Sequence, residues 1–289
     1  MWSIAPDSKG IGLRSDHLAD LCGQPRHPHI DFLELAPDNW MDIGGARRTM
    51  LNDIAGRYPL VAHGLNLSIG DLSPLNLDYL ANIRRFLDEY QIAIYSDHLS
   101  FCRDEQGYLY DLLPVPRFAE NIDYLAGRIR QVVDILDRPL VLENISWYHG
   151  YAGEMPEIEF WLALLEKSPC EMLLDINNVW VNAQNHGYDA LSYIRALPGE
   201  KIRYYHIAGH LHTPSGLLDT HGMPVDDDVL RLARETFRFH GTRPLLLERD
   251  NHVPPLNTLC EELVTVTEFI HQARSEHEPA TQTHRAAYS

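Results

Sequence analysis

The chain has 289 residues, of which 45% are hydrophobic and 22% charged, the composition of an ordinary globular protein. Lys and Arg number 24 against 41 Asp and Glu, so the formal net charge is −17. This charge repels phosphate backbones and anionic lipids, and we therefore expect neither nucleic acid nor a membrane as a partner. No secretory signal and no apolar run long enough for a membrane span is visible, which predicts a cytoplasmic protein.

Runs rich in Leu, Ile and Val alternate with amphipathic stretches along most of the chain. The predicted strands are 11–14, 30–35, 60–67, 92–97, 140–144, 172–176, 202–207 and 244–248. The predicted helices are 15–22, 46–57, 77–90, 119–136, 156–167, 188–196, 227–239 and 259–272. This alternation predicts an α/β fold, a (β/α)8 TIM barrel formed by a single domain over residues 1–275.

Three further features complete the predicted organisation. A doubly wound open sheet is the alternative fold, but no G-x-G-x-x-G follows the first strand. Residues 276–289 are polar and aperiodic and are expected to form a disordered tail. The segments 99–117 and 209–225 are expected to be long loops on the active face, and the acidic run 226–228 is expected to cap the helix that follows it.

Most of the predicted strands end in a His, Asp, Glu or Asn, although a buried strand needs no polar residue there. These strand-end residues are His63, His98, Glu143, Asp175, His206 and Glu248. In a parallel barrel the carboxyl ends of the strands meet on one face, where active sites are found. The pattern therefore predicts one polar constellation assembled from distant segments.

Further candidates lie in the connections between strands. Asp219 and His221 are two residues apart, close enough to chelate one ion, and His186 lies in an Asn-His-Gly turn sequence. Asn177 and Asn178 either offer neutral oxygens or shape a turn. Asp97 is available to orient an imidazole.

The candidate set contains imidazoles and carboxylates but no thiolate, which points to a metal centre. The four cysteines are far apart and form no C-x-x-C pair, which argues against disulfides and a zinc ribbon. A single mononuclear site uses only two His and one carboxylate, so this inventory predicts several metals bridged by Glu or Asp. Iron, manganese and zinc all suit these ligands, and spacing alone does not separate them. The roles of five other histidines stay open: His17, His149, His210, His212 and His252.

The ordered motifs over about residues 10–270 resemble the DUF692 family, the multinuclear non-heme iron-dependent oxidases. The motifs that carry the resemblance are Ile11-Gly-Leu-Arg, Phe32-Leu-Glu-Leu-Ala-Pro-Asp-Asn-Trp, His63-Gly-Leu-Asn-Leu-Ser, Ser96-Asp-His-Leu-Ser, Leu112-Leu-Pro, Glu143-Asn-Ile-Ser, Leu174-Asp-Ile-Asn-Asn-Val, Asn185-His-Gly, His206-Ile-Ala-Gly-His, Asp219-Thr-His-Gly and Leu247-Glu-Arg-Asp. One departure is Pro37-Asp-Asn-Trp, where the family commonly has Pro-Glu-Asn-Trp. It lies away from the expected ligands and leaves metal binding intact.

The resemblance implies an oxidase that modifies cysteines in ribosomally synthesised precursor peptides, with O2 as co-substrate. It implies a barrel with on the order of two or three Fe(II)/Fe(III) ions, and a small partner protein that binds the precursor's leader. The metal ligands implied on this chain are His63, His98, Glu143, Asp175, His186, His206, Asp219, His221 and Glu248. Of these, the catalytic residues are expected to be His98, Glu143 and Asp175.

Two other functions fit the same constellation. One is a zinc- or manganese-dependent hydrolase or isomerase, in a barrel resembling xylose isomerase or endonuclease IV. The endonuclease version needs a basic groove, which the charge of −17 disfavours. The other is a metal-loaded scaffold that binds a peptide leader without turning it over. Dependence on O2 and a mass change in a co-expressed peptide separate these readings.

Overall fold

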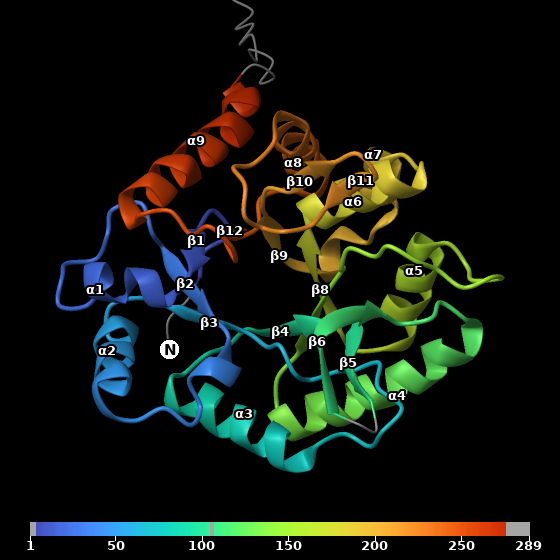
Figure 1. Ribbon diagram of the computed structural model, residues 1–289, viewed down its shortest axis with the longest axis horizontal. Coiled ribbons are helices and arrows are strands. Elements are labelled where there is room, and N and C mark those ends of the chain that lie inside the picture. Colours follow the sequence, from blue (N-terminus) through green and yellow to red (C-terminus); the bar gives the residue numbers. More distant parts are fainter. Residues whose placement is uncertain (1–3, 105–106, 276–289) are drawn as a thin grey trace, which may run out of the picture.

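The computed structural model describes residues 4–104 and 107–275, and within these ranges its centre is a closed barrel of eight parallel strands (Figure 1). The barrel strands are β1 (Lys9–Gly12), β2 (Phe32–Leu35), β3 (Leu60–His63), β4 (Tyr95–His98), β7 (Leu140–Glu143), β8 (Glu171–Asp175), β9 (Ile202–Ile207) and β12 (Leu245–Leu247). Each pairs with its sequence neighbour in the barrel, and β12 closes the barrel against β1. The predicted fold is confirmed, while the predicted tail at 276–289 lies outside the described residues.

Helices form a ring around the barrel (Figure 1). They are α1 (Leu18–Leu21), α2 (Gly45–Ala55), α3 (Leu77–Glu89), α4 (Ala119–Leu136), α5 (Glu157–Lys167), α6 (Ile176–His186), α7 (Ala190–Ala196), α8 (Asp227–His240) and α9 (Leu256–Ser275), with 3-10 turns η1 (Ser15–His17), η2 (Pro37–Asn39) and η3 (Gly199–Lys201). Their apolar faces pack on the outer surface of the strands in one continuous core. In the described part of the chain, no helix has the length and apolarity to cross a membrane.

The sequence analysis missed helix α6, which begins directly after β8. We expected Asn177 and Asn178 to have only a turn or ligand role, yet both lie in the first turn of this helix. Asparagine is a poor helix former, so local propensity gives little warning of α6. The helix is stabilised by side-chain contacts to a neighbouring connection, where Asn178 donates to the Asn144 carbonyl and Asn182 donates to the Ile145 carbonyl.

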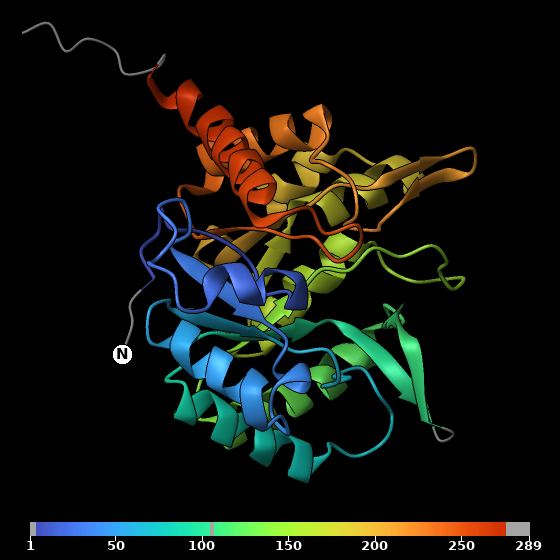
Figure 2. The same cartoon turned by 60° about the vertical axis from the view of Figure 1, so that its left-hand side comes forward.

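Two expected long loops are β-hairpins. Within 99–117 lie β5 (Ser100–Asp104) and β6 (Gly107–Pro114), and within 209–225 lie β10 (Leu211–Thr213) and β11 (Gly216–Leu218). Each hairpin is an antiparallel pair separate from the barrel. Both project from the same side of the molecule, together with the connection between β7 and α5 (Figure 2). They therefore border one face of the barrel.

The interior of the barrel changes from apolar to polar along the strands. Residues at the lower level form a small buried cluster separate from the main core: Phe32, Val61, Ile94, Val141, Leu173, Tyr204 and Leu246. Successive inward side chains on a strand are two residues apart. Two residues beyond six of these positions stand Glu34, His63, Ser96, Glu143, Asp175 and His206, and Glu248 follows Leu246. The apolar layer thus supports a layer of polar groups at the carboxyl end.

Candidate metal centre

Strands β3, β4 and β7 bring together two imidazoles and one carboxylate. His63 Nε2 lies 3.1 Å from His98 Nε2 and 3.1 Å from Glu143 Oε2, and His98 Nε2 lies 3.4 Å from the same oxygen. Ligand atoms placed about 2.1 Å from one ion stand at comparable separations from each other. All three side chains are buried. Two His with one carboxylate is the set that holds non-heme Fe(II) in many oxygenases.

The other oxygen of Glu143 faces a second group on β8, β9 and β12. His206 Nδ1 lies 3.7 Å from Glu143 Oε1 and 2.9 Å from Glu248 Oε2. Ligand atoms of Glu143, Asp175, His206 and Glu248 all lie within 4.8 Å of one another. Because β8 and β9 are in parallel register with Asp175 opposite His206, the barrel itself sets this arrangement. Glu143 therefore stands between two groups of candidate ligands.

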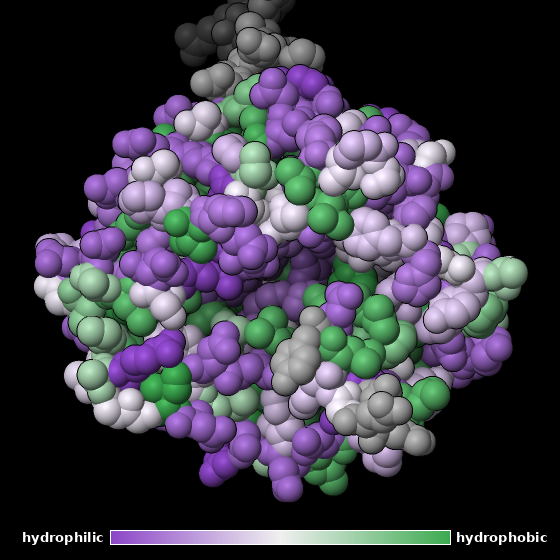
Figure 3. Space-filling view, viewed as in Figure 1, coloured by the Kyte–Doolittle hydropathy of each residue, from purple (hydrophilic) through white to green (hydrophobic). Residues whose placement is uncertain are grey.

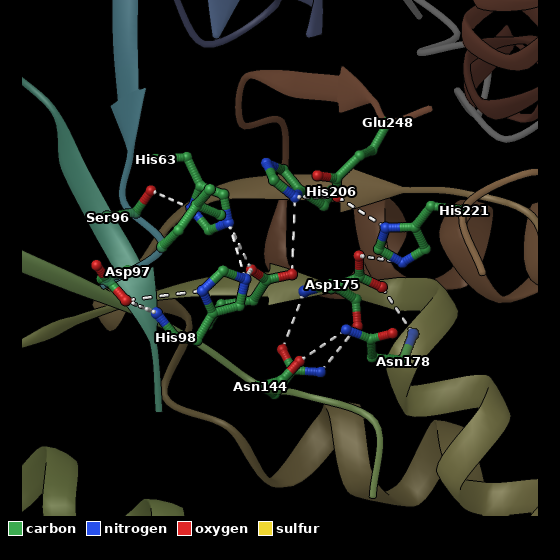
Figure 4. A network of polar contacts seen from close by, with 12 residues as sticks. His63, Ser96, Asp97, His98, Asn144, Asp175, Asn178, His206, His221 and Glu248 are labelled. Carbon is green, nitrogen blue, oxygen red and sulfur yellow. Dashed lines mark hydrogen bonds and ion pairs between the residues drawn. The ribbon is translucent and has the colours of Figure 1, made fainter. Parts of the chain in front are cut away.

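A third group extends the centre toward the connection after β9 (Figure 4). His221 Nδ1 lies 3.1 Å from Glu248 Oε2 and 3.4 Å from Asp250 Oδ2, while His221 Nε2 lies 2.8 Å from Asp219 Oδ1. Asn177 donates to the same Asp219 oxygen at 3.0 Å. His221 has a φ of 46°, a left-handed conformation that costs a non-glycine residue free energy. Such strain is typical of functional sites.

Several buried polar atoms that point into the centre make no hydrogen bond. They are Glu143 Oε2, Asp175 Oδ2, His206 Nδ1 and His221 Nε2. Buried polar groups are nearly always hydrogen-bonded, so each exception needs an explanation. A set of unpaired carboxylate oxygens and imidazole nitrogens facing each other is the donor set of a metal site. The residues present therefore fit a multinuclear metal centre.

The carboxylates also change the protonation of their neighbours. Burial disfavours a charged His63, but its hydrogen bond with Glu143 and the charge of that carboxylate outweigh burial and raise the pKa of His63 to about 9. Burial acts against the ionised Glu143 too, yet contacts with His206 and His63 hold its pKa below the ordinary value. For Asp175 burial dominates and raises the pKa to about 8.

The second group behaves in the same way. Against the effect of burial, the charges of Glu34 and Glu248 hold the pKa of His206 well above its ordinary value. Burial is likewise outweighed at His221 by the charges of Asp219 and Glu248, which raise its pKa. Without metal, protons on the imidazoles thus offset the buried carboxylates. A bound metal ion would displace those protons and take over this role.

A chain of hydrogen bonds runs beneath the ligands and joins the two groups. Ser96 Oγ is 2.8 Å from His63 Nδ1 and 2.7 Å from the hydroxyl of Tyr204. That hydroxyl donates to Glu34 Oε2 at 2.7 Å, and the same oxygen lies 3.1 Å from His206 Nε2. These contacts occupy the outer nitrogen of each imidazole and leave the inner nitrogen for a metal.

Asp175 and His98 are also held from outside the centre (Figure 4). Asp175 Oδ1 caps α6 by accepting from the Asn178 amide at 2.6 Å, which leaves Oδ2 facing inward. The Asn144 side chain bonds both the amide and the carbonyl of Asp175. Asp97 Oδ1 accepts from the His98 amide and lies 3.6 Å from His98 Nδ1.

The structure gathers all but one of the ligands that the sequence analysis expected. The exception is His186, at the end of α6, which stacks on Trp147 with ring centroids 3.5 Å apart. Its Nε2 lies 2.8 Å from the Trp147 carbonyl, and His186 belongs to none of the described groups with metal-binding geometry. Gly64, expected to admit a ligand, instead admits the Asp97 carboxylate and the Tyr95 hydroxyl, which a Cβ would contact.

The sequence analysis missed two members of the site. Glu34 lies inside the apolar strand β2, and only its cost of burial among Phe32, Leu33 and Leu35 could have drawn attention to it. Tyr204 sits one level below the ligands and gave no signal beyond its place in β9.

A cavity of about 840 Å³ leads from the surface to this centre. Figure 3 shows it as a hollow with a hydrophilic floor near the middle of the face. His63, His98 and Glu248 lie on its floor, while Trp40 and Tyr108 are among the residues of its wall. The cavity is therefore large enough for a ligand of several hundred cubic ångströms, the usual size range of enzyme pockets.

Comparison with protein families shows a match over nearly the whole chain. Residues 8–271 match the model of a family described as "RiPP precursor modification enzyme MbnB/TglH/ChrH", where RiPP denotes a ribosomally synthesised and post-translationally modified peptide. A UPF0276 protein of Shewanella amazonensis is 45% identical over 261 residues, covering 90% of this chain and 93% of that protein. A UPF0276 protein of Pseudomonas aeruginosa is 44% identical over 261 residues, covering 90% and 91%.

Solved structures are similar in fold alone. D-psicose 3-epimerase from Clostridium cellulolyticum H10 has a TM-score of 0.61 at 10% identity, covering 92% of this chain and 98% of that one. A xylose isomerase domain protein from Planctomyces limnophilus has a TM-score of 0.57 at 13% identity, covering 93% and 98%. At these identities the likeness supports the barrel and carries no argument about the reaction.

Proposed function

Because the chain belongs to the MbnB/TglH/ChrH family of RiPP precursor modification enzymes, we propose that it is an iron- and O2-dependent oxidase that modifies cysteine residues of a precursor peptide. The observation that carries this proposal is the position of Glu143 between two groups of buried ligands. A carboxylate with one oxygen toward each group is suited to bridge two ions, and its unpaired oxygen is otherwise unexplained.

The residues that would hold the metals follow from the contacts. His63, His98 and Glu143 would hold one ion, and Glu143, Asp175, His206 and Glu248 a second. Asp219 and His221 would extend the centre to a third position. When bound, iron in such ligands supplies redox chemistry with O2 and binds a substrate thiolate.

The protein's own part is to hold these ligands and admit the peptide. His63 and His206 are fixed by Ser96 and Glu34, so their orientation does not depend on the substrate. The cavity reaches His63 and His98 but is lined elsewhere by Leu65, Leu112 and other apolar side chains. A cysteine side chain of an extended peptide could enter this cavity while the rest of the peptide stays at the mouth.

The test is co-expression of this chain with a cysteine-containing peptide encoded beside it, followed by peptide mass measurement. We expect a mass change that requires iron and O2, maps to cysteine, and disappears when that cysteine is replaced by Ser. The matched enzyme control is Glu143→Gln, which keeps the side-chain size but removes the bridging charge. An unchanged peptide after exposure to iron-loaded enzyme and O2 would reject the proposal.

The same experiment addresses the other functions considered from the sequence. A zinc or manganese hydrolase or isomerase would act equally well without O2. A scaffold that only binds the peptide would retain it on the enzyme without changing its mass. Family membership favours the peptide-modifying oxidase over both, and the small leader-binding partner implied by the resemblance remains part of this proposal.

A further inference from the structure

A second cluster of possible ligands lies outside the centre, between the β10–β11 hairpin and the start of α8. His210, His212 and Asp226 each offer a ligand atom within 4.8 Å of the others. The rings of His210 and His212 have centroids 4.9 Å apart. The segments that carry these residues are packed closely, because a Cβ on Gly209 would contact the carbonyl oxygens of Met223 and Pro224.

His210 provides an independent sign that something binds here. The residue is 4% exposed, and its Nδ1 lies 2.8 Å from the side-chain oxygen of Asn177. That contact makes Nδ1 the protonated nitrogen, so Nε2 carries a free lone pair. Nε2 is buried and has no hydrogen-bond partner. A buried acceptor without a partner costs free energy that a bound cation would recover.

Asp226 and His212 complete the geometry. Asp226 uses Oδ1 to accept the amide of Asp228 and so caps α8, as the sequence predicts. This leaves Oδ2, which lies 3.6 Å from His212 Nε2. His212 is largely exposed, with 69% of its side chain accessible, so an ion can reach the cluster directly from solvent.

We propose that His210, His212 and Asp226 form a separate site for a divalent transition-metal ion of the Zn2+ class. Two imidazoles and one carboxylate with a water in the fourth position form a common tetrahedral zinc set. The ion would link the base of the β10–β11 hairpin to the first turn of α8. Through Asn177, which contacts both His210 and Asp219, it would also restrain the connection that brings Asp219 to the main centre.

The site does not rest on the proposed oxidase function, and its test is independent of turnover. Full-length protein with its main centre loaded with iron is titrated anaerobically with Co2+, and bound cobalt is measured by visible absorption and by metal analysis. Wild type is expected to bind one Co2+ that Zn2+ displaces, with iron content unchanged. His212→Ala is expected to lose that Co2+ and to keep its iron, because His212 contacts no residue of the main centre in the described contacts.

Two further variants make the result decisive. Asp226→Asn keeps an N-cap acceptor for α8 and is expected to weaken Co2+ binding by more than the roughly 10–100-fold cost of losing an outer partner. His29→Ala removes an exposed histidine far along the chain from the cluster and is expected to bind cobalt like wild type. The proposal is overturned if wild type binds no additional Co2+, if His212→Ala binds as much as wild type, or if His29→Ala loses as much as His212→Ala.

Discussion

The two sides of the metal centre share Glu143 but differ in their other ligands. On one side stand His63 and His98, two imidazoles beside a single carboxylate. On the other side stands one imidazole, His206, among several carboxylates that include Glu248. The first side is therefore less negative than the second.

The supporting contacts differ in the same direction. His63 is held by the neutral hydroxyl of Ser96, whereas His206 is held by the carboxylate of Glu34. A carboxylate partner makes an imidazole a more basic ligand. We therefore expect the two positions to be inequivalent, with the more highly charged ion on the His206 side.

The largest effect is expected from removing what the two sides share. Glu143→Gln should lose metal from both positions, because it removes the one charged group that faces each of them. Iron per chain and turnover should both fall by more than the roughly 10–100-fold typical of outer-partner losses. The control is Glu157→Gln, another buried carboxylate, which contacts Trp147 and Tyr193 instead. Normal iron content in Glu143→Gln would show that Glu143 bridges nothing.

One-sided variants should separate the two positions. His98→Ala should release the ion on the His63 side and retain the one on the His206 side, and Glu248→Ala should do the reverse. Iron analysis combined with X-ray absorption of each variant measures the number and type of ligands that remain. Complete loss of iron in both variants would mean that the positions fill only together.

The metal-free protein should show the cost of its buried charges as pH rises. The pKa of His63 is raised from 6.5 to about 9, mainly through Glu143 and against burial, with a further contribution from Glu34. Stability from this group is therefore fully present below pH 6.5 and lost as pH rises to about 9. The raised pKa of Asp175, about 8, acts in the same direction. The thermal midpoint of metal-free protein should fall between pH 6.5 and 9, and metal-loaded protein should lack this fall.

A smaller effect is expected from the hydrogen bonds that join the two sides. Tyr204→Phe removes the hydroxyl between Ser96 and Glu34 without touching a ligand, and should weaken metal binding by about 10–100-fold. Tyr205→Phe is the matched control, since its hydroxyl contacts the Gly241 carbonyl instead. Equal metal affinities in the two variants, measured by chelator competition, would remove the hydrogen-bond chain from the account.

The smallest effect on metal is expected at His186. His186→Ala loses the stack on Trp147 and one hydrogen bond, which should cost about 1 kcal/mol of stability. Iron content should not change, because His186 lies with none of the candidate groups. If this variant loses as much iron as His98→Ala, the ligand assignment implied by family resemblance is right and the described geometry is incomplete.

Much of the fold follows from the sequence because the barrel strands are short apolar runs. The predicted strand 202–207 coincides with β9, and the predicted helix 119–136 coincides with α4. Helix α6 did not follow, because its asparagines bond to a distant connection rather than favour a helix by themselves. The hairpins β5–β6 and β10–β11 were also missed, since neither carries a strong two-residue turn signal.

The candidate site shows the same division. His63, His98 and Glu143 could be anticipated because parallel strands bring their carboxyl ends to one face. Glu34 and Tyr204 could not, since the contacts that make them part of the site join strands 170 residues apart in the sequence. The sequence places residues at strand ends, whereas the pairing of their atoms requires the closed barrel.

The central claim is a multinuclear iron centre bridged by Glu143. The most direct test is metal analysis with Mössbauer spectroscopy on protein enriched in 57Fe and purified without oxygen. The account predicts at least two irons per chain, magnetically coupled, with two distinct environments that merge or vanish in Glu143→Gln. Stoichiometric zinc or manganese without iron, persisting after iron-replete expression, would contradict it.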